Sequence, residues 1–213
     1  KPAILFGDRT LTYRELSEAV DRTARGLTAD GVALGDRVAL FLPNIPEFAV
    51  VYFAVQKVGA VAVSLNGMLT TEEVDYALAD SGASLLFTSE ALLPQVRPLI
   101  GAALAPERVV VCEGDAGGFT TLDRFGIDTP DRFKARDLEP DAPAAILYTS
   151  GTTGKQKGAV LSHRNVVSNA HATAHALPIH PTDRLLLFLP LFHCFGQNFI
   201  LNAAIASGAT VVL

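Results

Sequence analysis

Short apolar runs rich in valine, leucine and alanine alternate along the chain with longer stretches in which apolar residues recur at helical spacing. Such runs predict buried strands, and they occupy residues 37–42, 60–65, 84–88, 108–112, 144–148, 184–189 and 209–213. Near-continuous apolar strands that alternate with helices favour a mostly parallel sheet. The pattern therefore predicts an α/β fold with helices on both faces of the sheet, in three α/β/α layers.

Polar residues that can cap helices mark where the helices begin. The capping signals are Thr12 with Glu15, Asn44 with Glu47, Thr70 with Glu73, and Ser162. From these starts and the apolar spacing, helices are expected over residues 13–30, 45–59, 71–82, about 90–100, 163–177 and 196–206. Residues 3–6 and 10–12 flank Gly7-Asp8 and predict a β-hairpin.

Composition narrows the range of functions. The 213 residues carry a formal net charge of −5, and their 17 lysines and arginines are scattered, so nothing favours nucleic-acid binding. The apolar stretch 48–63 is interrupted by polar residues and a glycine, and no membrane span is expected. Two cysteines, Cys112 and Cys194, do not make a disulfide framework, so we expect a reduced, cytoplasmic protein.

A polar, glycine-rich loop follows the apolar run 144–148. Its hydroxyl, glycine and lysine residues are Thr149, Ser150, Gly151, Thr152, Thr153, Gly154, Lys155, Lys157 and Gly158. Glycines let backbone N–H groups approach a ligand closely, and lysines add positive charge, so the loop predicts a phosphate site at the end of a buried strand. A flexible linker is the alternative, because segments of this composition often serve only as linkers.

The Walker A phosphate loop does not fit these residues. Its pattern would require a glycine at Thr149 and a magnesium-binding hydroxyl at Gln156. A Walker loop also opens directly into a helix, whereas the apolar residues 159–161 predict a second short strand. A phosphate loop of another kind is therefore expected.

His193 follows the predicted strand 184–189, at the position where open α/β sheets bind ligands. From position alone, a site histidine and a histidine in a surface turn are equally compatible with the sequence. His171 and His175 have metal-ligand spacing, but they lack the H-E-x-x-H pattern, so we interpret them as exposed and expect no metal site. Cys194 cannot easily face its neighbour His193, and a buried thiol is expected.

The motif that begins at Tyr148, Tyr-Thr-Ser-Gly-Thr-Thr-Gly-x-x-Lys-Gly, resembles the signature phosphate loop of the adenylate-forming superfamily. This superfamily includes acyl-CoA synthetases, luciferases and the adenylation domains of peptide synthetases. Further similar motifs are Leu-Thr-Tyr-Arg-Glu-Leu at 11–16, Gly-Asp-Arg-Val-Ala-Leu-Phe-Leu-Pro-Asn at 35–44, and Leu-Pro-Leu-Phe-His at 189–193. The chain departs from the family at Gln156, Ser64 and Gly67, where prolines are usual. At Gln156 we expect a looser loop rather than loss of phosphate binding.

The resemblance covers nearly the whole chain, but only the amino-terminal part of such an enzyme. It implies that residues 1–213 are the amino-terminal portion of an AMP-binding ligase domain. The segment 113–143 is rich in aspartate, glycine and proline, and any internal seam is expected there. The family's adenine, ribose, magnesium and lid residues lie downstream of these motifs, so the chain alone is expected to be inactive.

The resemblance also implies an activity, that of an AMP-forming acid–thiol ligase. ATP and a small-molecule carboxylic acid, here expected to be a fatty acid, would give an acyl-adenylate and pyrophosphate, and a thiol would then accept the acyl group. Implied ATP-binding residues are Thr149, Ser150, Gly151, Thr152, Thr153, Gly154, Lys155 and Lys157. His193 is implied as catalytic, and His193, Phe195 and Gly196 as bordering the acid. ATP, Mg²⁺ and coenzyme A, or a carrier-protein phosphopantetheine, are the implied cofactors.

Two functions of other classes stay open on the residues alone. One is a non-catalytic α/β module that binds a nucleotide or phosphate. The other is a structural interaction domain in which the glycine-rich loop is only a linker.

Overall fold

The computed structural model describes residues 1–129, 131–149 and 156–213. A seven-stranded sheet forms the centre, with the strand order β7-β6-β5-β3-β4-β8-β9. Its strands are β3 (Arg37–Leu40), β4 (Val61–Ser64), β5 (Leu85–Thr88), β6 (Val109–Val111), β7 (Thr120–Thr121), β8 (Pro143–Thr149) and β9 (Lys157–Ser162). All neighbouring strands pair in parallel except β8 and β9, which form an antiparallel hairpin. The expected mostly parallel sheet is confirmed.

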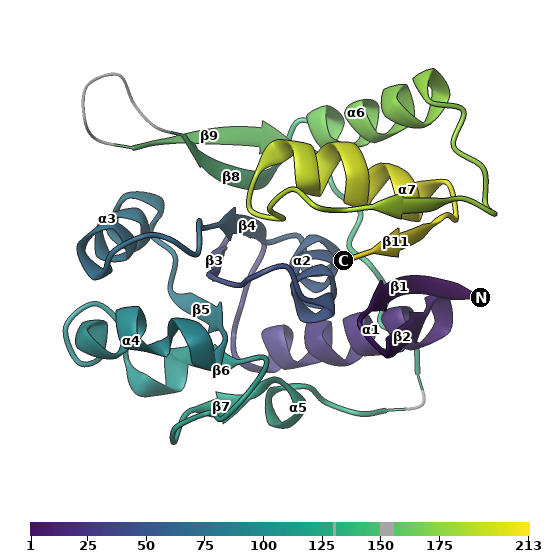
Figure 1. Cartoon of the computed structure of the whole chain (residues 1–213). Coiled ribbons are helices and arrows are strands. Elements are labelled where there is room, and N and C mark those ends of the chain that lie inside the picture. Colours follow the sequence, from purple (N-terminus) through teal and green to yellow (C-terminus); the bar gives the residue numbers. More distant parts are fainter. Residues whose placement is uncertain (130, 150–155) are drawn as a thin grey trace.

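Helices cover both faces of this sheet (Figure 1). One face carries α1 (Tyr13–Ala29) and α2 (Pro46–Val58), and the other carries α3 (Thr71–Ser81) and the short α4 (Leu93–Val96). A hydrophobic core lies on each face of the sheet, and successive side chains of β3 alternate between the two cores. Val38 and Leu40 pack with α1 and α2, while Ala39 packs with α3. The α/β class and its two-sided covering are therefore as predicted.

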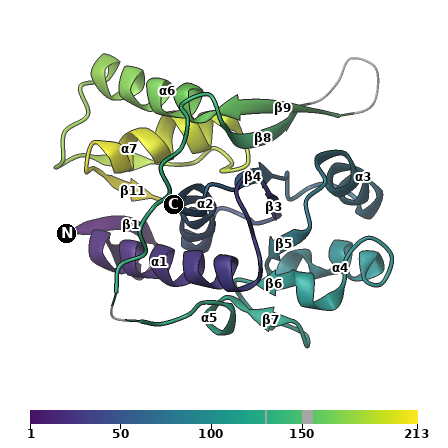
Figure 2. The same cartoon turned by 180° about the vertical axis from the view of Figure 1, so that it is seen from behind.

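A second, smaller sheet was not predicted. It has the order β10-β11-β1-β2 and contains β1 (Pro2–Phe6), β2 (Arg9–Thr12), β10 (Arg184–Leu186) and β11 (Thr210–Val212). The predicted hairpin is β1–β2, and β1 also pairs in parallel with β11, so that Ile4 lies opposite Val211. The sheet thus joins segments from the two ends of the described chain (Figures 1 and 2).

The prediction that residues 184–189 form a buried strand was wrong. The run begins with β10 at the edge of the small sheet, where Leu186 is 63% exposed, and Phe188, two residues beyond β10, is 73% exposed. An apolar run indicates a strand, but it does not say whether another layer covers that strand.

Most of the predicted helix starts are confirmed. Capping boxes join Thr12 to Glu15 at α1 and Thr70 to Glu73 at α3. The cap predicted at Asn44 was wrong, because α2 begins after Ile45 without a side-chain cap and with proline in its first turn. The predicted helix 90–100 is broken into η1 (Glu90–Leu92), α4 and η2 (Arg97–Leu99), with prolines in the first turns of the last two.

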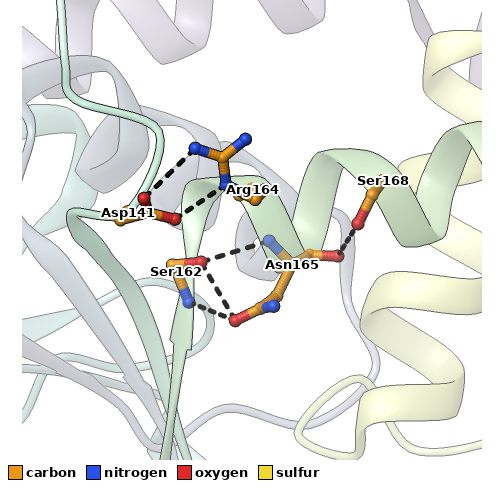
Figure 3. Close-up of polar contacts among 5 residues, drawn as sticks. All are labelled: Asp141, Ser162, Arg164, Asn165 and Ser168. Atoms are coloured by element: carbon orange, nitrogen blue, oxygen red, sulfur yellow. Dashed lines mark hydrogen bonds and ion pairs between the residues drawn. The ribbon is translucent and has the colours of Figure 1, made fainter.

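The helix α6 (His163–Ala176) begins where β9 ends (Figure 3). The Ser162 hydroxyl accepts the Asn165 N–H at 3.2 Å, and Asn165 Oδ1 accepts the Ser162 N–H at 3.0 Å, which completes a capping box. Arg164 donates two hydrogen bonds to the Asp141 carboxylate, at 2.7 and 3.1 Å. These contacts hold the open end of the β8–β9 hairpin, opposite the glycine-rich loop.

In the described part of the segment 113–143, the elements before β8 are short: β7 and α5 (Leu122–Phe125). A 3₁₀ turn, η3 (Pro106–Arg108), precedes β6. Arg25 of α1 donates hydrogen bonds to the carbonyl oxygens of Ile127 and Asp131, which holds part of the segment on the α1 side. No helix in the described ranges is long and apolar enough to cross a membrane.

Candidate functional site

The β8–β9 hairpin presents the glycine-rich loop. Thr149 ends β8 and lies opposite Lys157, which begins β9, and the Thr149 hydroxyl is 3.5 Å from the Lys157 carbonyl oxygen. The strand predicted after the loop is thus confirmed. The other predicted loop residues, Ser150, Gly151, Thr152, Thr153, Gly154 and Lys155, lie outside the described residues.

Gly158 is required at the base of this loop because two side chains of β8 cross it. A Cβ at Gly158 would lie 2.8 Å from Ile146 Cγ2 and 3.4 Å from Tyr148 Cζ. Tyr148 is the residue paired with Gly158 across the hairpin. A Cβ at this position would force the Ile146 side chain to shift, since real Cβ contacts essentially never reach 2.8 Å.

His193 lies in an exposed turn directly before the π-helix η4 (Phe195–Asn202). Its backbone N–H donates to the Pro190 carbonyl at 3.1 Å, and its ring Nδ1 accepts the N–H of Phe195 at 3.2 Å. Because Nδ1 accepts this bond, the neutral ring carries its proton on Nε2. The imidazole can therefore offer an Nε2–H donor to a ligand.

The expectation for Cys194 was wrong. The residue is exposed rather than buried, and its Sγ lies 3.7 Å from His193 Nδ1. The compact turn before η4 brings the two neighbouring side chains together, which an extended backbone would not. Cys112 is the more sheltered cysteine, and burial raises the pKa of its thiol well above the usual value.

Phe195 and Gly196 occupy different environments on η4. Phe195 is 41% exposed, and its ring lies 4.3 Å from that of Phe199, centroid to centroid. Gly196 is buried, and a Cβ there would lie 2.3 Å from the Pro190 carbonyl oxygen. Gly196 therefore lets η4 approach the turn that carries His193.

Asn44 holds that turn onto the central sheet, a role that the sequence did not reveal. The residue follows β3, and its Nδ2 donates to the Leu189 carbonyl at 2.9 Å. Its Oδ1 accepts the N–H of Leu191 at 2.8 Å. The available signal was the polar side chain after a buried strand, which we had assigned to helix capping.

A second unpredicted anchor joins η4 to the same sheet. Gln197 Nε2 donates to Ser64 Oγ at 2.8 Å, and both residues are buried. Ser64 ends β4, the strand beside β8. The departure from the usual proline at Ser64 thus creates a hydroxyl that binds this helix.

The two anchors place both predicted motifs at one edge of the sheet. The parallel strands β3, β4 and β8 are neighbours, and their carboxyl ends lead to Asn44, Ser64 and Thr149 respectively. Neighbouring strands are about 5 Å apart, so the turn with His193 and the base of the loop share one edge. This edge is where ligands bind in open α/β sheets.

Nothing in the described part of the chain forms a metal centre of protein ligands. Among those residues, no group of three or more His, Cys, Asp or Glu is placed to hold an ion. His171 and His175 are exposed on α6, as expected.

Comparison with known proteins agrees with this arrangement. A family model described as AMP-binding enzyme matches residues 1–213. The feruloyl-CoA synthase of Amycolatopsis sp. is 36% identical over 99% of this chain and 40% of its own length. The fatty acid–[acyl-carrier-protein] ligase ScoC of Streptomyces coeruleorubidus is 38% identical, also over 99% of this chain and 40% of its own length.

A solved structure matches the fold over the whole chain. The anthranilate CoA ligase AuaEII, crystallised with anthranoyl-AMP, superposes with a TM-score of 0.90 and 29% identity. The match covers 100% of this chain and 42% of AuaEII. The chain therefore spans about two fifths of the proteins that it resembles, and it belongs to the AMP-binding enzyme family.

Proposed function

We propose that the full-length protein activates a carboxylic acid with ATP and transfers the acyl group to a thiol. In the first step a carboxylate oxygen attacks the α-phosphorus of ATP, and pyrophosphate leaves. In the second step the thiol sulfur attacks the acyl carbon, and AMP leaves. The observation that carries this proposal is the shared sheet edge, where Thr149 and Lys157 close the loop beside the turn with His193.

The role of the loop is electrostatic and positional. Lys157 would neutralise phosphate charge, and Thr149 with the hydroxyls and N–H groups of residues 150–155 would bind the β- and γ-phosphates. Holding these phosphates leaves the α-phosphorus open to in-line attack. Mg²⁺, when bound, would further neutralise the phosphates.

His193 would orient the acid. Because its Nδ1 is engaged by the Phe195 N–H, the Nε2–H is the group that can donate to a carboxylate oxygen. Phe195, next along the chain, supplies an exposed apolar surface beside this position, and Gly196 allows the close approach of η4. A donor at the carboxylate and an apolar surface behind it suit an acid with an apolar body.

We propose a fatty acid as the substrate and coenzyme A as the acceptor, in the cytoplasm. The relative ScoC is named for a fatty acid, whereas the feruloyl-CoA synthase and AuaEII are named for aromatic acids. ScoC is also named for an acyl-carrier-protein acceptor, so carrier-protein phosphopantetheine is the second candidate for the thiol. Both acceptors present the same phosphopantetheine thiol chemistry.

Acid-dependent exchange of labelled pyrophosphate into ATP, measured on the full-length protein, tests this proposal. We expect exchange with fatty acids, and a fall of roughly 10²- to 10³-fold in Lys157→Ala, because a charged group that stabilises the transition state is lost. Lys134→Ala is the matched control, since Lys134 is also an exposed lysine but lies in the segment 113–143. The proposal would be contradicted if no carboxylic acid supported exchange. It would also be contradicted if Lys157→Ala and Lys134→Ala lowered the exchange rate equally.

A further inference from the structure

The helix α3 contacts both ends of the glycine-rich loop through two tyrosines. It lies beside the loop end of the β8–β9 hairpin in both views (Figures 1 and 2). We infer that Tyr76 and Asp80 of α3 are positioning residues, which hold the loop so that Lys157 meets the phosphates of ATP. This inference rests on the proposed function. It adds two residues of α3, a helix that lies outside the glycine-rich motif that begins at Tyr148.

Tyr76 holds the side of the loop that enters β9. Its hydroxyl donates to the carbonyl oxygen of Gln156 at 3.1 Å, and the contact is partly buried. Gln156 directly precedes Lys157. Because Gln156 replaces the proline that is usual in similar sequences, its backbone lacks the restraint of a pyrrolidine ring. The bond from Tyr76 restrains the backbone at this position.

Asp80 holds the side of the loop that leaves β8. The Tyr148 hydroxyl lies 2.7 Å from Asp80 Oδ2 and 3.2 Å from the Ala77 carbonyl oxygen. A phenol has one proton to donate, and the shorter contact to the charged acceptor is the stronger. Burial, together with the bond to Asp80, raises the pKa of Tyr148, so the phenol stays protonated and remains a donor. Tyr148 directly precedes Thr149 in the strand.

The helix itself is firmly attached, which lets it serve as a support. Val74, Ala77 and Leu78 are buried in the core beneath the sheet. At its carboxyl end, Arg37 of β3 donates to the Ser81 carbonyl at 2.8 Å and to the Gly82 carbonyl at 3.0 Å. The tyrosine contacts therefore connect the loop ends to an element that the central sheet already fixes.

A purely structural role for these contacts makes a different prediction from a positioning role. Loss of a structural bond lowers stability without changing the affinity for ATP. Loss of a positioning bond raises KM for ATP or lowers the turnover of adenylation, while KM for the acid is unchanged. Tyr13→Phe is a matched control, because the Tyr13 hydroxyl also donates to a backbone carbonyl oxygen, that of Ala209, at 2.6 Å. Both residues lie far along the chain from the glycine-rich loop.

The experiment is steady-state pyrophosphate exchange by the full-length protein in the Tyr76→Phe, Asp80→Ala, Asp80→Asn and Tyr13→Phe variants. We expect Tyr76→Phe and Asp80→Ala to raise KM for ATP by about 2- to 10-fold, the range that one hydrogen bond supplies. Asp80→Asn keeps an oxygen that accepts the Tyr148 proton and should restore most of the loss. Tyr13→Phe should lower the melting temperature to a similar extent as Tyr76→Phe and leave KM for ATP unchanged.

The outcomes separate this inference from the proposed function. If the wild-type protein shows acid-dependent exchange but Tyr76→Phe and Asp80→Ala match Tyr13→Phe in KM for ATP and in turnover, the inference is overturned and the proposed function stands. An equal KM defect in Asp80→Asn and Asp80→Ala would overturn the role of the Tyr148–Asp80 bond. If no carboxylic acid supports pyrophosphate exchange by the wild-type protein, the proposed function fails, and the inference that rests on it fails too.

Discussion

The inner strands of the central sheet and the edge strand β10 of the small sheet have similar apolar sequences, but they differ in how far their side chains are buried. The strands β4 and β5 are buried along their entire lengths, and β3 is buried after Arg37, because helices cover both faces. The apolar run that begins with β10 is different, because Leu186, at the edge of the small sheet, and Phe188, just beyond β10, are largely exposed. The base of the glycine-rich loop comes from the β8–β9 hairpin, in which β8 pairs with the buried strand β4. The turn with His193 follows the exposed edge strand β10.

This difference explains the two anchors. The hairpin of the loop belongs to the central sheet and is held by strand pairing on both sides of β8. The turn with His193 has no such support from β10, and the side chains of Asn44 and Ser64 attach it and η4 to the central sheet instead. The position of the glycine-rich loop therefore depends on strand pairing, whereas the position of the turn with His193 depends on a few side-chain hydrogen bonds.

The largest effect on stability is expected when a buried phenylalanine of the central sheet is truncated in the 213-residue chain, with Phe188, just beyond β10, as the exposed control. Phe87 of β5 is fully buried, and its ring packs edge-on against Phe125 at 5.3 Å. Phe87→Ala should lower the free energy of unfolding by about 3–5 kcal/mol, because it leaves a cavity. Phe188→Ala should change it by less than about 0.5 kcal/mol, since the side chain is 73% exposed. Denaturant unfolding measures both, and similar losses would contradict the difference between the sheets.

Asn44→Ala tests the attachment of the His193 turn. The variant removes two hydrogen bonds and leaves the Leu189 carbonyl and the Leu191 N–H without this partner, at a cost of about 1–3 kcal/mol in stability. In the full-length protein we expect KM for the acid to rise more than KM for ATP, because the turn moves and the loop does not. Steady-state exchange kinetics measure the two constants, and Asn44→Asp is a matched control that keeps an acceptor for the Leu191 N–H. A larger change in KM for ATP would show that the anchor serves the loop.

The smallest effect on stability is expected at the open end of the β8–β9 hairpin, where Arg164 binds Asp141. Arg164 lowers the pKa of the Asp141 carboxyl below its usual 3.8, mainly through its hydrogen bonds to that group. A lowered pKa in the folded state stabilises the protein above the unfolded-state pKa, and the contribution disappears as the pH falls through the folded-state value. The difference in melting temperature between wild type and Asp141→Asn should therefore be small at pH 7, decrease as the pH falls below about 4, and vanish below the lowered folded-state pKa. A difference that grows on acidification would contradict this assignment.

Local sequence signals predicted the elements well. The capping boxes at Thr12, Thr70 and Ser162 locate helix starts because the cap is a local bond between residues three apart. The apolar runs located the strands, and the glycine-rich motif indicated a loop between two strands. The prolines at 94 and 98 are also a local signal, and they account for the break in the helix expected over residues 90–100.

Contacts between distant residues could not be predicted in the same way. The pairing of β1 with β11 joins residues about two hundred positions apart, and no local pattern specifies it. Asn44, Ser64, Tyr76 and Asp80 each carry an ordinary polar side chain, and their partners lie elsewhere in the sequence. Only the fold shows which of the many polar residues meet the two motifs.

Direct detection of the acyl-adenylate tests the proposed activation of a carboxylic acid by ATP most simply. The full-length protein is mixed with ATP, Mg²⁺ and a fatty acid without any thiol, quenched, and analysed by mass spectrometry. We predict acyl-AMP and an equal amount of pyrophosphate, both absent when the acid is omitted. Formation of ADP and phosphate, or no acyl-AMP with any carboxylic acid, would contradict it.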